Sequence, residues 1–198
     1  MEAVDTKRIG KYEIEVIQDS DPESPREWDN LGTMVCQHRR YNLGDKHDYD
    51  LNDCNSWLDV QKELGYPPII LNLYLYDHGG ITMRCEPFGD KWDSGQVGFI
   101  FATNETLVKE YGRVDEEIIK KAQSVLEGEV ETYDQYLTGD VYGYKIYELS
   151  TCDHGHEHRE EIDSCWGYYG EDSCMEEADS IVNSLIKHDQ DVEQTRYP

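Results

Sequence analysis

The alternation of apolar and polar residues predicts strands at several places along the chain. In KYEIEVIQD (11–19), apolar side chains alternate with acidic ones, which is the pattern of a half-buried strand. The run IILNLYLY (69–76) is followed by the turn residues DHGG and a second apolar run at 81–85, which predicts a β-hairpin. Further strands are expected at 33–38, 96–103, 140–149 and 161–170.

Apolar residues spaced three to four apart predict helices elsewhere. The expected helices are 56–65, 105–112, 115–139 and 173–189. We expect Gly65 to cap the end of the first helix and Asn104 to cap the start of the second.

A few residues of the two later helices predict where these helices begin or end. Two alternatives are open at Gly128: it ends the helix, or the run continues as a second helix to Gly139. Ser173 and Glu176 have the spacing of a capping box, which predicts that the last helix begins at Ser173.

The order of these elements predicts the fold class. The strands follow one another in pairs rather than alternating strictly with helices, which favours an α+β fold, with a mainly antiparallel sheet and three to four helices packed on it. A chain of 198 residues fits one domain, so we expect a single α+β domain over 1–198, with 150–172 as a His/Cys-rich loop.

Charge is the feature that departs most from an ordinary domain. Asp and Glu total 43 against 18 Lys and Arg, a formal net charge of −25. This surplus either keeps the protein in solution or presents a polyanion-like surface to a basic partner. Nucleic acid is excluded as a direct ligand unless a local basic patch overrides the repulsion, and the one dense basic cluster is QHRRYN (37–42).

No segment has the pattern of a signal peptide, and no apolar run reaches the length of about 18 residues that suggests a membrane span. We therefore expect a cytoplasmic protein without a membrane partner. In that compartment the six cysteines would be reduced thiols.

The segment LEGEVETYDQYLTGDVYGY (126–144) concentrates carboxylates among tyrosines and has no Lys or Arg. If it is helical, Glu127 and Glu131 lie one turn apart on a shared face. The tyrosines are either core residues or interface anchors. The predicted partner-binding residues are Glu127, Glu129, Glu131, Asp134, Asp140, Tyr133 and Tyr136. The acids expected to join them are Glu171, Asp172, Glu176, Glu177 and Asp179.

Two segments contain residue types that bind metals. The candidate zinc ligands are Cys152, His154, His156 and His158, with Cys165 and Cys174 downstream. Their spacing matches none of the common structural zinc patterns, so an exposed polar loop without a cofactor is the alternative. The candidate calcium ligands are Asp48, Asp50, Asn52, Ser56 and Asp59. Asp53 occupies the position where a calcium loop needs glycine, which favours a plain acidic loop.

The chain has no G-x-S-x-G, H-E-x-x-H or phosphate-binding glycine motif. His78 in DHGG could act as a base, but a hairpin turn explains this segment without catalysis. A metal-dependent enzyme acting on a nucleotide or a signalling molecule therefore stays as the alternative to a binding protein.

Four blocks of the chain carry a resemblance to a family. The blocks are ESPREWDNLGTMVC (23–36), WDSGQVGFI (92–100), GEVETYDQYLTGDVYGY (128–144) and DSCWGYYG (163–170). They resemble a largely uncharacterised family of small acidic proteins that is common in bacteriophages and mobile elements. The resemblance transfers no catalytic residue.

The resemblance implies a phage-encoded protein that counters host defence. Combined with the acidic charge, it predicts an inhibitor that occupies the basic nucleic-acid-binding groove of a host defence or nucleic-acid-processing complex by mimicking DNA or RNA. The expected partner is a basic nucleic-acid-binding protein or nuclease complex in the host cytoplasm.

Overall fold

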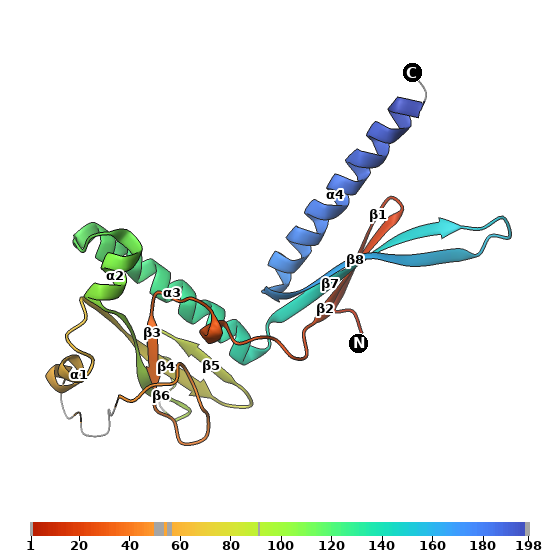
Figure 1. Ribbon diagram of the computed structural model, residues 1–198. Coiled ribbons are helices and arrows are strands. Elements are labelled where there is room, and N and C mark those ends of the chain that lie inside the picture. The colour runs from red at the N-terminus through yellow and green to blue at the C-terminus, as the bar shows by residue number, and fades with distance from the viewer. Residues whose placement is uncertain (1, 50–53, 55–56, 91, 197–198) are drawn as a thin grey trace. The chain divides into compact units, whose positions relative to one another are not determined.

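The computed structural model describes residues 2–49, 54, 57–90 and 92–196 (Figure 1). Within these described residues there are two antiparallel sheets and four α-helices, with 35% of residues helical and 34% in strands. These elements confirm the predicted α+β class with helices packed on antiparallel sheets.

Backbone contacts divide the chain into two compact units and not into the single domain expected from the sequence. The terminal unit consists of Met1–Glu23 and Gly139–Pro198, and the central unit is Ser24–Thr138. The two ends of the chain are therefore brought into one unit, because a strand near the N-terminus pairs with strands that follow residue 139.

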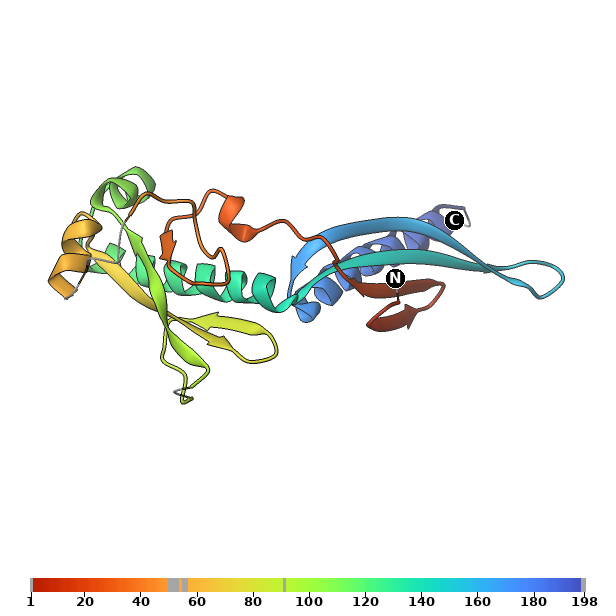
Figure 2. The same ribbon diagram turned by 90° about the horizontal axis from the view of Figure 1, so that it is seen from below.

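The terminal unit is a four-stranded antiparallel sheet in the order β1-β2-β7-β8, with one helix on it. Its elements are β1 (Asp5–Ile9), β2 (Tyr12–Gln18), β7 (Val141–Thr151), β8 (Glu157–Tyr169) and α4 (Glu171–Arg196). Helix α4 lies along one face of this sheet (Figure 2).

The core of the terminal unit lies between α4 and the two central strands. Ile14 of β2 is opposite Ile146 of β7, and both side chains are fully buried. Cys174, Ala178 and Val182 recur every four residues on α4 and are also fully buried. Small side chains at two of these three positions let the helix pack closely on the sheet.

Two predictions for this unit are wrong in detail. Helix α4 begins at Glu171 rather than at Ser173, so Ser173 and Glu176 lie inside the helix and form no capping box at its start. Gly170, at φ 88°, makes the sharp turn from β8 into the helix, a conformation that favours glycine. The strand expected at 161–170 is part of β8, but the loop expected over 150–172 is wrong, because β7 runs to Thr151, β8 begins at Glu157 and only the short turn 152–156 separates them.

The central unit is a second antiparallel sheet, in the order β3-β6-β4-β5. Its strands are β3 (Thr33–Cys36), β4 (Ile69–Asp77), β5 (Ile81–Arg84) and β6 (Ser94–Ala102). Its helices are the 3-10 helix η1 (Pro25–Glu27), α1 (Trp57–Glu63), α2 (Asn104–Tyr111) and α3 (Glu116–Thr138).

Helix α3 covers one face of the central sheet (Figures 1 and 2). Ala122, Leu126 and Val130 form its buried stripe and belong to the same apolar cluster as Ile100 of β6 and Met83 of β5. On the other face of the sheet, a smaller cluster joins buried residues of two strands to residues of α1 and its end: Val35, Phe99, Phe101, Val60 and Leu64.

Gly128 neither ends α3 nor separates it from a second helix, because α3 runs unbroken from Glu116 to Thr138, which corrects both alternatives left by the sequence. A glycine inside a helix costs about 1 kcal/mol relative to alanine. The helix continues because Leu126, Val130 and Tyr133 on either side of Gly128 are buried, so their packing outweighs this cost.

The ends of α1 and α2 are close to the predicted positions. Gly65, at φ 74°, follows α1 as expected. The cap of α2 is Thr103 rather than Asn104, because the backbone N–H of Thr106 donates to Thr103 Oγ1 at 3.1 Å. Among the described residues, no helix is long and apolar enough to cross a membrane.

Candidate acidic binding site

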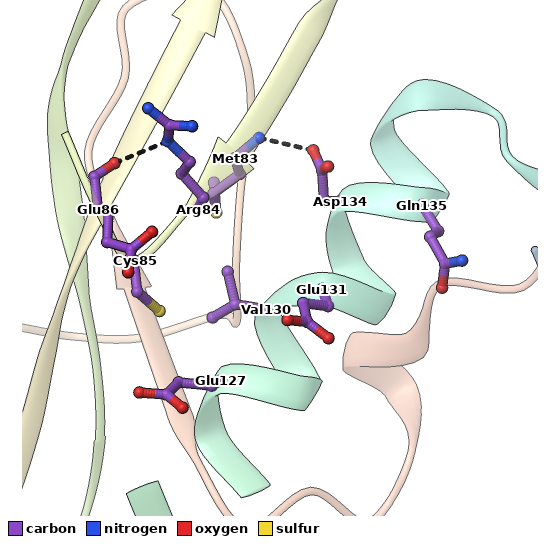
Figure 3. Close-up of a pocket in the computed structure, with 9 residues that line it drawn as sticks. All are labelled: Met83, Arg84, Cys85, Glu86, Glu127, Val130, Glu131, Asp134 and Gln135. Carbon is purple, nitrogen blue, oxygen red and sulfur yellow. Dashed lines mark hydrogen bonds between the residues drawn. The ribbon is translucent and has the colours of Figure 1, made fainter. Parts of the chain in front are cut away.

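An acidic recess of about 460 Å³ lies between β5 and α3 in the central unit (Figure 3). Arg84, Cys85 and Glu86 line one wall, and Glu127, Val130, Glu131, Asp134 and Gln135 line the other, with Met83 between them. Three of the predicted partner-binding residues therefore meet here: Glu127, Glu131 and Asp134.

Helix geometry explains why these three carboxylates converge. At 100° per residue, positions 127, 131 and 134 fall within about 60° of one another around the helix axis. Glu129, two residues from Glu127, is on the opposite side by the same geometry, and it lines a different pocket. The predicted acidic run is thus split between two faces of α3.

Asp134 attaches the helix to the edge of the sheet. Its Oδ1 accepts the backbone N–H of Met83 at 2.6 Å and the hydroxyl of Thr82 at 2.7 Å. Because β5 is an edge strand, the Met83 N–H has no strand partner on that side, and a carboxylate supplies one. Asp134 therefore has a structural role in addition to its charge.

Arg84 lies beside the recess but does not neutralise it. Its Nε donates to the carbonyl of Glu86 at 3.0 Å and its Nη2 to the carbonyl of Pro87 at 2.7 Å. Its guanidinium is 3.9 Å from the ring centroid of Phe88. In Figure 3 it points away from the two glutamates of the helix.

The remaining carboxylates of the recess are available to a ligand. Within the described part of the chain, Glu86, Glu127 and Glu131 form no ion pair. Glu127 accepts one hydrogen bond, from the Gln123 amide at 2.8 Å. The recess therefore presents three carboxylates whose charge no neighbouring cation balances.

The negative charge of the recess affects the ionisation of the Cys85 thiol. Burial raises the pKa of its thiol, and the charges of Glu127, Glu86 and Glu131 raise it further, to about 11. The thiol is therefore protonated at neutral pH, which makes it a poor nucleophile.

Glu129 belongs to a buried network instead of an open surface. It accepts the backbone N–H of Leu31 at 2.7 Å and pairs with Arg26 at 3.1 Å. The Arg26 side chain is only 5% exposed and also pairs with Asp45 at 2.8 Å. The network holds the 24–32 segment against α3.

The two tyrosines of the predicted surface are mainly structural. Tyr133 is buried, and its hydroxyl accepts the backbone N–H of Gly44 at 3.0 Å. Burial raises the pKa of this hydroxyl, so the tyrosine stays neutral. Tyr136 is half-buried and stacks on Tyr133, with ring centroids 6.0 Å apart.

The other predicted acids lie in the terminal unit. Asp140 immediately precedes β7, and its carbonyl accepts the N–H of Gly170 at 2.9 Å. On α4, Asp179 pairs with Lys7, Glu171 is half-buried, and the exposed carboxylates are Asp172, Glu176 and Glu177.

The candidate zinc ligands Cys152 to His158 lie at the tip of the β7–β8 hairpin. This hairpin extends past the β1–β2 pair in Figure 2. Cys152, His154 and His156 lie in the turn and His158 lies in β8, and the three histidine side chains are exposed. Among the described residues, no three His, Cys, Asp or Glu side chains are placed so that they could hold a metal ion.

The remaining candidates stay apart from the recess. Asp50, Asn52, Asp53 and Ser56 of the candidate calcium loop lie outside the described residues, and Asp59 lies in α1. His78 lies in the β4–β5 turn, 70% exposed, with its Nδ1 2.9 Å from Asp93 Oδ2. This pair connects the β4–β5 turn to the loop before β6. His78 therefore lies in a hairpin turn, as the sequence predicts.

Cys85 and Glu86, which form the second wall, were not among the residues predicted from the sequence. The only feature of the sequence that could have indicated this wall is the acidic residue Glu86, in the polar loop EPFGD directly after a predicted strand. No family model, no curated protein and no solved structure matches this chain.

Proposed function

We propose that this protein is a non-enzymatic binding protein that occupies a basic nucleic-acid-binding groove of a partner protein. The observation that carries the proposal is the acidic recess, in which Glu86, Glu127 and Glu131 form no ion pair among the described residues. Glu127 is half-buried, whereas Glu86 and Glu131 are exposed. Three like charges concentrated at one recess attract an external cation more strongly than isolated surface carboxylates do.

The recess suits an arginine or a lysine of such a partner. Glu127 and Glu131 are separated by about 6 Å along the helix axis, and Glu86 faces them from the strand side. A guanidinium can bond two carboxylates at once through its planar fork, while the apolar stem can contact Val130 and Cys85.

The charge of the whole chain supports the same partner. The terminal unit carries 22 Asp and Glu against 7 Lys and Arg, and the central unit 21 against 11. Both units are therefore strongly negative, which raises the association rate with a positively charged groove and makes it sensitive to salt. A protein that fills such a groove excludes nucleic acid from it by competition.

The resemblance to acidic phage proteins supports a biological setting for this competition. In that setting the chain is a phage-encoded inhibitor in the host cytoplasm, and its target is a host defence or nucleic-acid-processing complex. The contact chemistry proposed above does not depend on this setting, so the two parts can be tested separately.

The test compares two sets of charge-neutralising variants. The recess variant is Glu86→Gln, Glu127→Gln and Glu131→Gln together. The matched control removes the same charge from exposed positions of the same unit, with Glu105→Gln, Glu110→Gln and Glu116→Gln. Each protein is immobilised, incubated with bacterial lysate at low salt and eluted with a salt gradient, and the eluted partner is then bound again in the presence of a DNA or RNA oligonucleotide.

We expect the partner to leave the recess variant at lower salt than the wild type, while the control keeps most of the wild-type retention. The oligonucleotide should displace the partner from the wild type. Equal loss in both variants would mean that the total charge acts without a specific site. A partner that stays bound at high salt and in excess oligonucleotide would contradict mimicry.

A further inference from the structure

A second recess, of about 570 Å³, lies on the central unit away from α3. It is bordered by the segment 37–40 after β3, by the end of β4 and by the start of β6, and we call it the Trp92 recess. Its composition is unlike the rest of the chain, because it contains the one dense basic cluster that the sequence analysis identified.

Trp92 stands at this recess with 95% of its surface exposed. Tryptophan is usually well buried, so an indole with almost no intramolecular contact points to a ligand that covers it. The backbone below the ring is held in place, since Asp90 Oδ1 accepts the N–H groups of Trp92 at 2.7 Å and Asp93 at 3.1 Å.

Two arginines face the same recess. Arg40 pairs with Asp77 at 3.1 Å and lies 5.2 Å from the ring centroid of Tyr41, which restrains its guanidinium. Arg39 forms no ion pair within the described part of the chain, so its charge is available. Asp77 and Asp93 also line the recess, but each is already paired with a cation or an imidazole.

His38 adds a hydrogen-bond donor. Its Nδ1 accepts the backbone N–H groups of Arg40 and Tyr41, both at 3.3 Å. A nitrogen that accepts these bonds carries no proton, so in the neutral ring the proton is on Nε2, which can donate. The ring stacks on Tyr41, with centroids 5.0 Å apart and planes 7° from parallel, and this fixes its orientation.

We propose that the Trp92 recess binds a mononucleotide. The base stacks on the Trp92 indole, and the phosphate is held by Arg39 and Arg40 with a hydrogen bond from His38 Nε2. An exposed aromatic ring beside arginines is the combination by which proteins bind unpaired nucleotides. This inference concerns a different surface from the acidic recess and does not rest on the proposed function.

Size and charge restrict the ligand to a short one. A recess of about 570 Å³ is within the range of small-ligand sites, roughly 300–1,000 Å³. A long nucleic acid would bring many phosphates near a chain of net charge −25, whereas a mononucleotide brings only its own phosphate to the arginines.

The test is calorimetric titration of the full chain with adenosine and guanosine 5′-monophosphates, the matching nucleosides, inorganic phosphate and a short single-stranded oligonucleotide. We expect saturable binding of a mononucleotide, and weaker binding of its nucleoside and of phosphate because each supplies only half of the contacts. Trp92→Ala should weaken mononucleotide binding about tenfold, the usual loss for removing one stacked base partner. Arg39→Ala should weaken it by a similar factor and should leave nucleoside binding unchanged.

Two controls match these variants in kind. Trp28→Ala removes another exposed tryptophan of the central unit, and Arg113→Ala removes an exposed arginine outside the recess. Both should bind as the wild type does. Because Trp92 is exposed, Trp92→Ala should also melt at the wild-type temperature.

Three outcomes would overturn the proposal: no saturable binding of either mononucleotide, equal losses in the control variants, or tighter binding of the oligonucleotide than of any mononucleotide. The last would assign the surface to a nucleic-acid strand instead.

Discussion

The indole of Trp166 lies directly over the backbone of Gly143, its partner on the neighbouring strand of the terminal sheet. A Cβ placed on Gly143 would be 2.3 Å from Trp166 Cε3 and 2.4 Å from Cδ2. No side chain fits there unless the ring moves. The glycine therefore sets the position of the tryptophan, and the pair links the two sequence blocks GDVYGY and CWGYYG.

Gly143→Ala should destabilise the terminal unit by about 1–3 kcal/mol, the usual cost of overpacking. Urea unfolding followed by circular dichroism would measure this loss. In a Trp166→Ala background the same substitution should cost less, because the ring it would strike is gone. Identical costs in both backgrounds would show that the contact with Trp166 is not the cause.

Gly128→Ala should have the opposite effect. Apart from its chain neighbours and the nearby backbone of its own helix, a Cβ at Gly128 meets no atom within 4 Å, and the residue lies inside α3. Alanine is favoured over glycine in a helix by about 1 kcal/mol, so the urea midpoint should rise. A lower midpoint would mean that α3 needs a flexible position here.

Much of the fold follows from local pattern. Alternation predicted β2 almost to the residue, and apolar residues spaced three to four apart predicted the helix that the structure has as α3. Two of the errors concern helix starts. Thr103 and Asn104 can both cap a helix, and the extended backbone at Thr103, which depends on the preceding strand, decides between them.

The site was less predictable than the fold. Helix periodicity places Glu127 and Glu131 together, but the opposite wall comes from Cys85 and Glu86, about forty residues earlier in the chain. Their approach depends on how α3 packs on the sheet, which no local pattern reports. Glu129 was grouped with its neighbours because it is close in sequence, although its side chain points to another face.

Asp134 should behave differently from the glutamates of the recess. Asp134→Ala leaves the buried N–H of Met83 without an acceptor, so it should lower the free energy of unfolding by about 1–3 kcal/mol. Asp134→Asn keeps an oxygen and should cost less. Glu131→Gln, at an exposed position, should leave the thermal melting temperature close to that of the wild type. Equal melting of all three variants would contradict the anchoring role.

The contact between the end of α4 and the sheet should depend on pH. Hydrogen bonds from Lys11 and Tyr12 lower the pKa of Asp189, and hydrogen bonds to Asp189 and Glu148 raise the pKa of Lys11. A depressed carboxyl pKa stabilises the fold above the unfolded value of about 4, and that contribution is lost as pH falls through the folded value. The raised lysine pKa contributes below the unfolded value of about 10.4, and is lost as pH rises through the folded value.

Amide hydrogen exchange would measure this dependence in the second half of α4. Protection there, relative to the first half, should be constant between about pH 5 and pH 9 and should fall in acid. At every pH, Asp189→Asn should show the low protection that the wild type shows only in acid. The acid-dependent step should therefore be absent from this variant. A step that persists in this variant would assign the acid dependence to another carboxylate.

The potential inside the acidic recess can be measured through Cys85. Its thiol pKa of about 11 has two causes, burial and the charges of Glu127, Glu86 and Glu131. Glu127→Gln with Glu131→Gln removes part of the second cause, so the pKa should fall and the thiolate fraction should rise. Alkylation of Cys85 by iodoacetamide at about pH 8.5, followed by peptide mass spectrometry, should then be at least about twofold faster than in the wild type.

Two comparisons make this measurement specific. Cys174 lies in the terminal unit, where burial also raises the pKa of its thiol, and its alkylation rate should not change. Glu105→Gln with Glu110→Gln removes the same charge from α2 and should leave Cys85 as slow as in the wild type. If both double variants accelerate Cys85 equally, its pKa reflects the net charge of the chain and not a concentration of carboxylates in the recess. The recess would then have no special affinity for a cationic side chain. The electrostatic potential at its wall would equal the potential elsewhere on the protein surface.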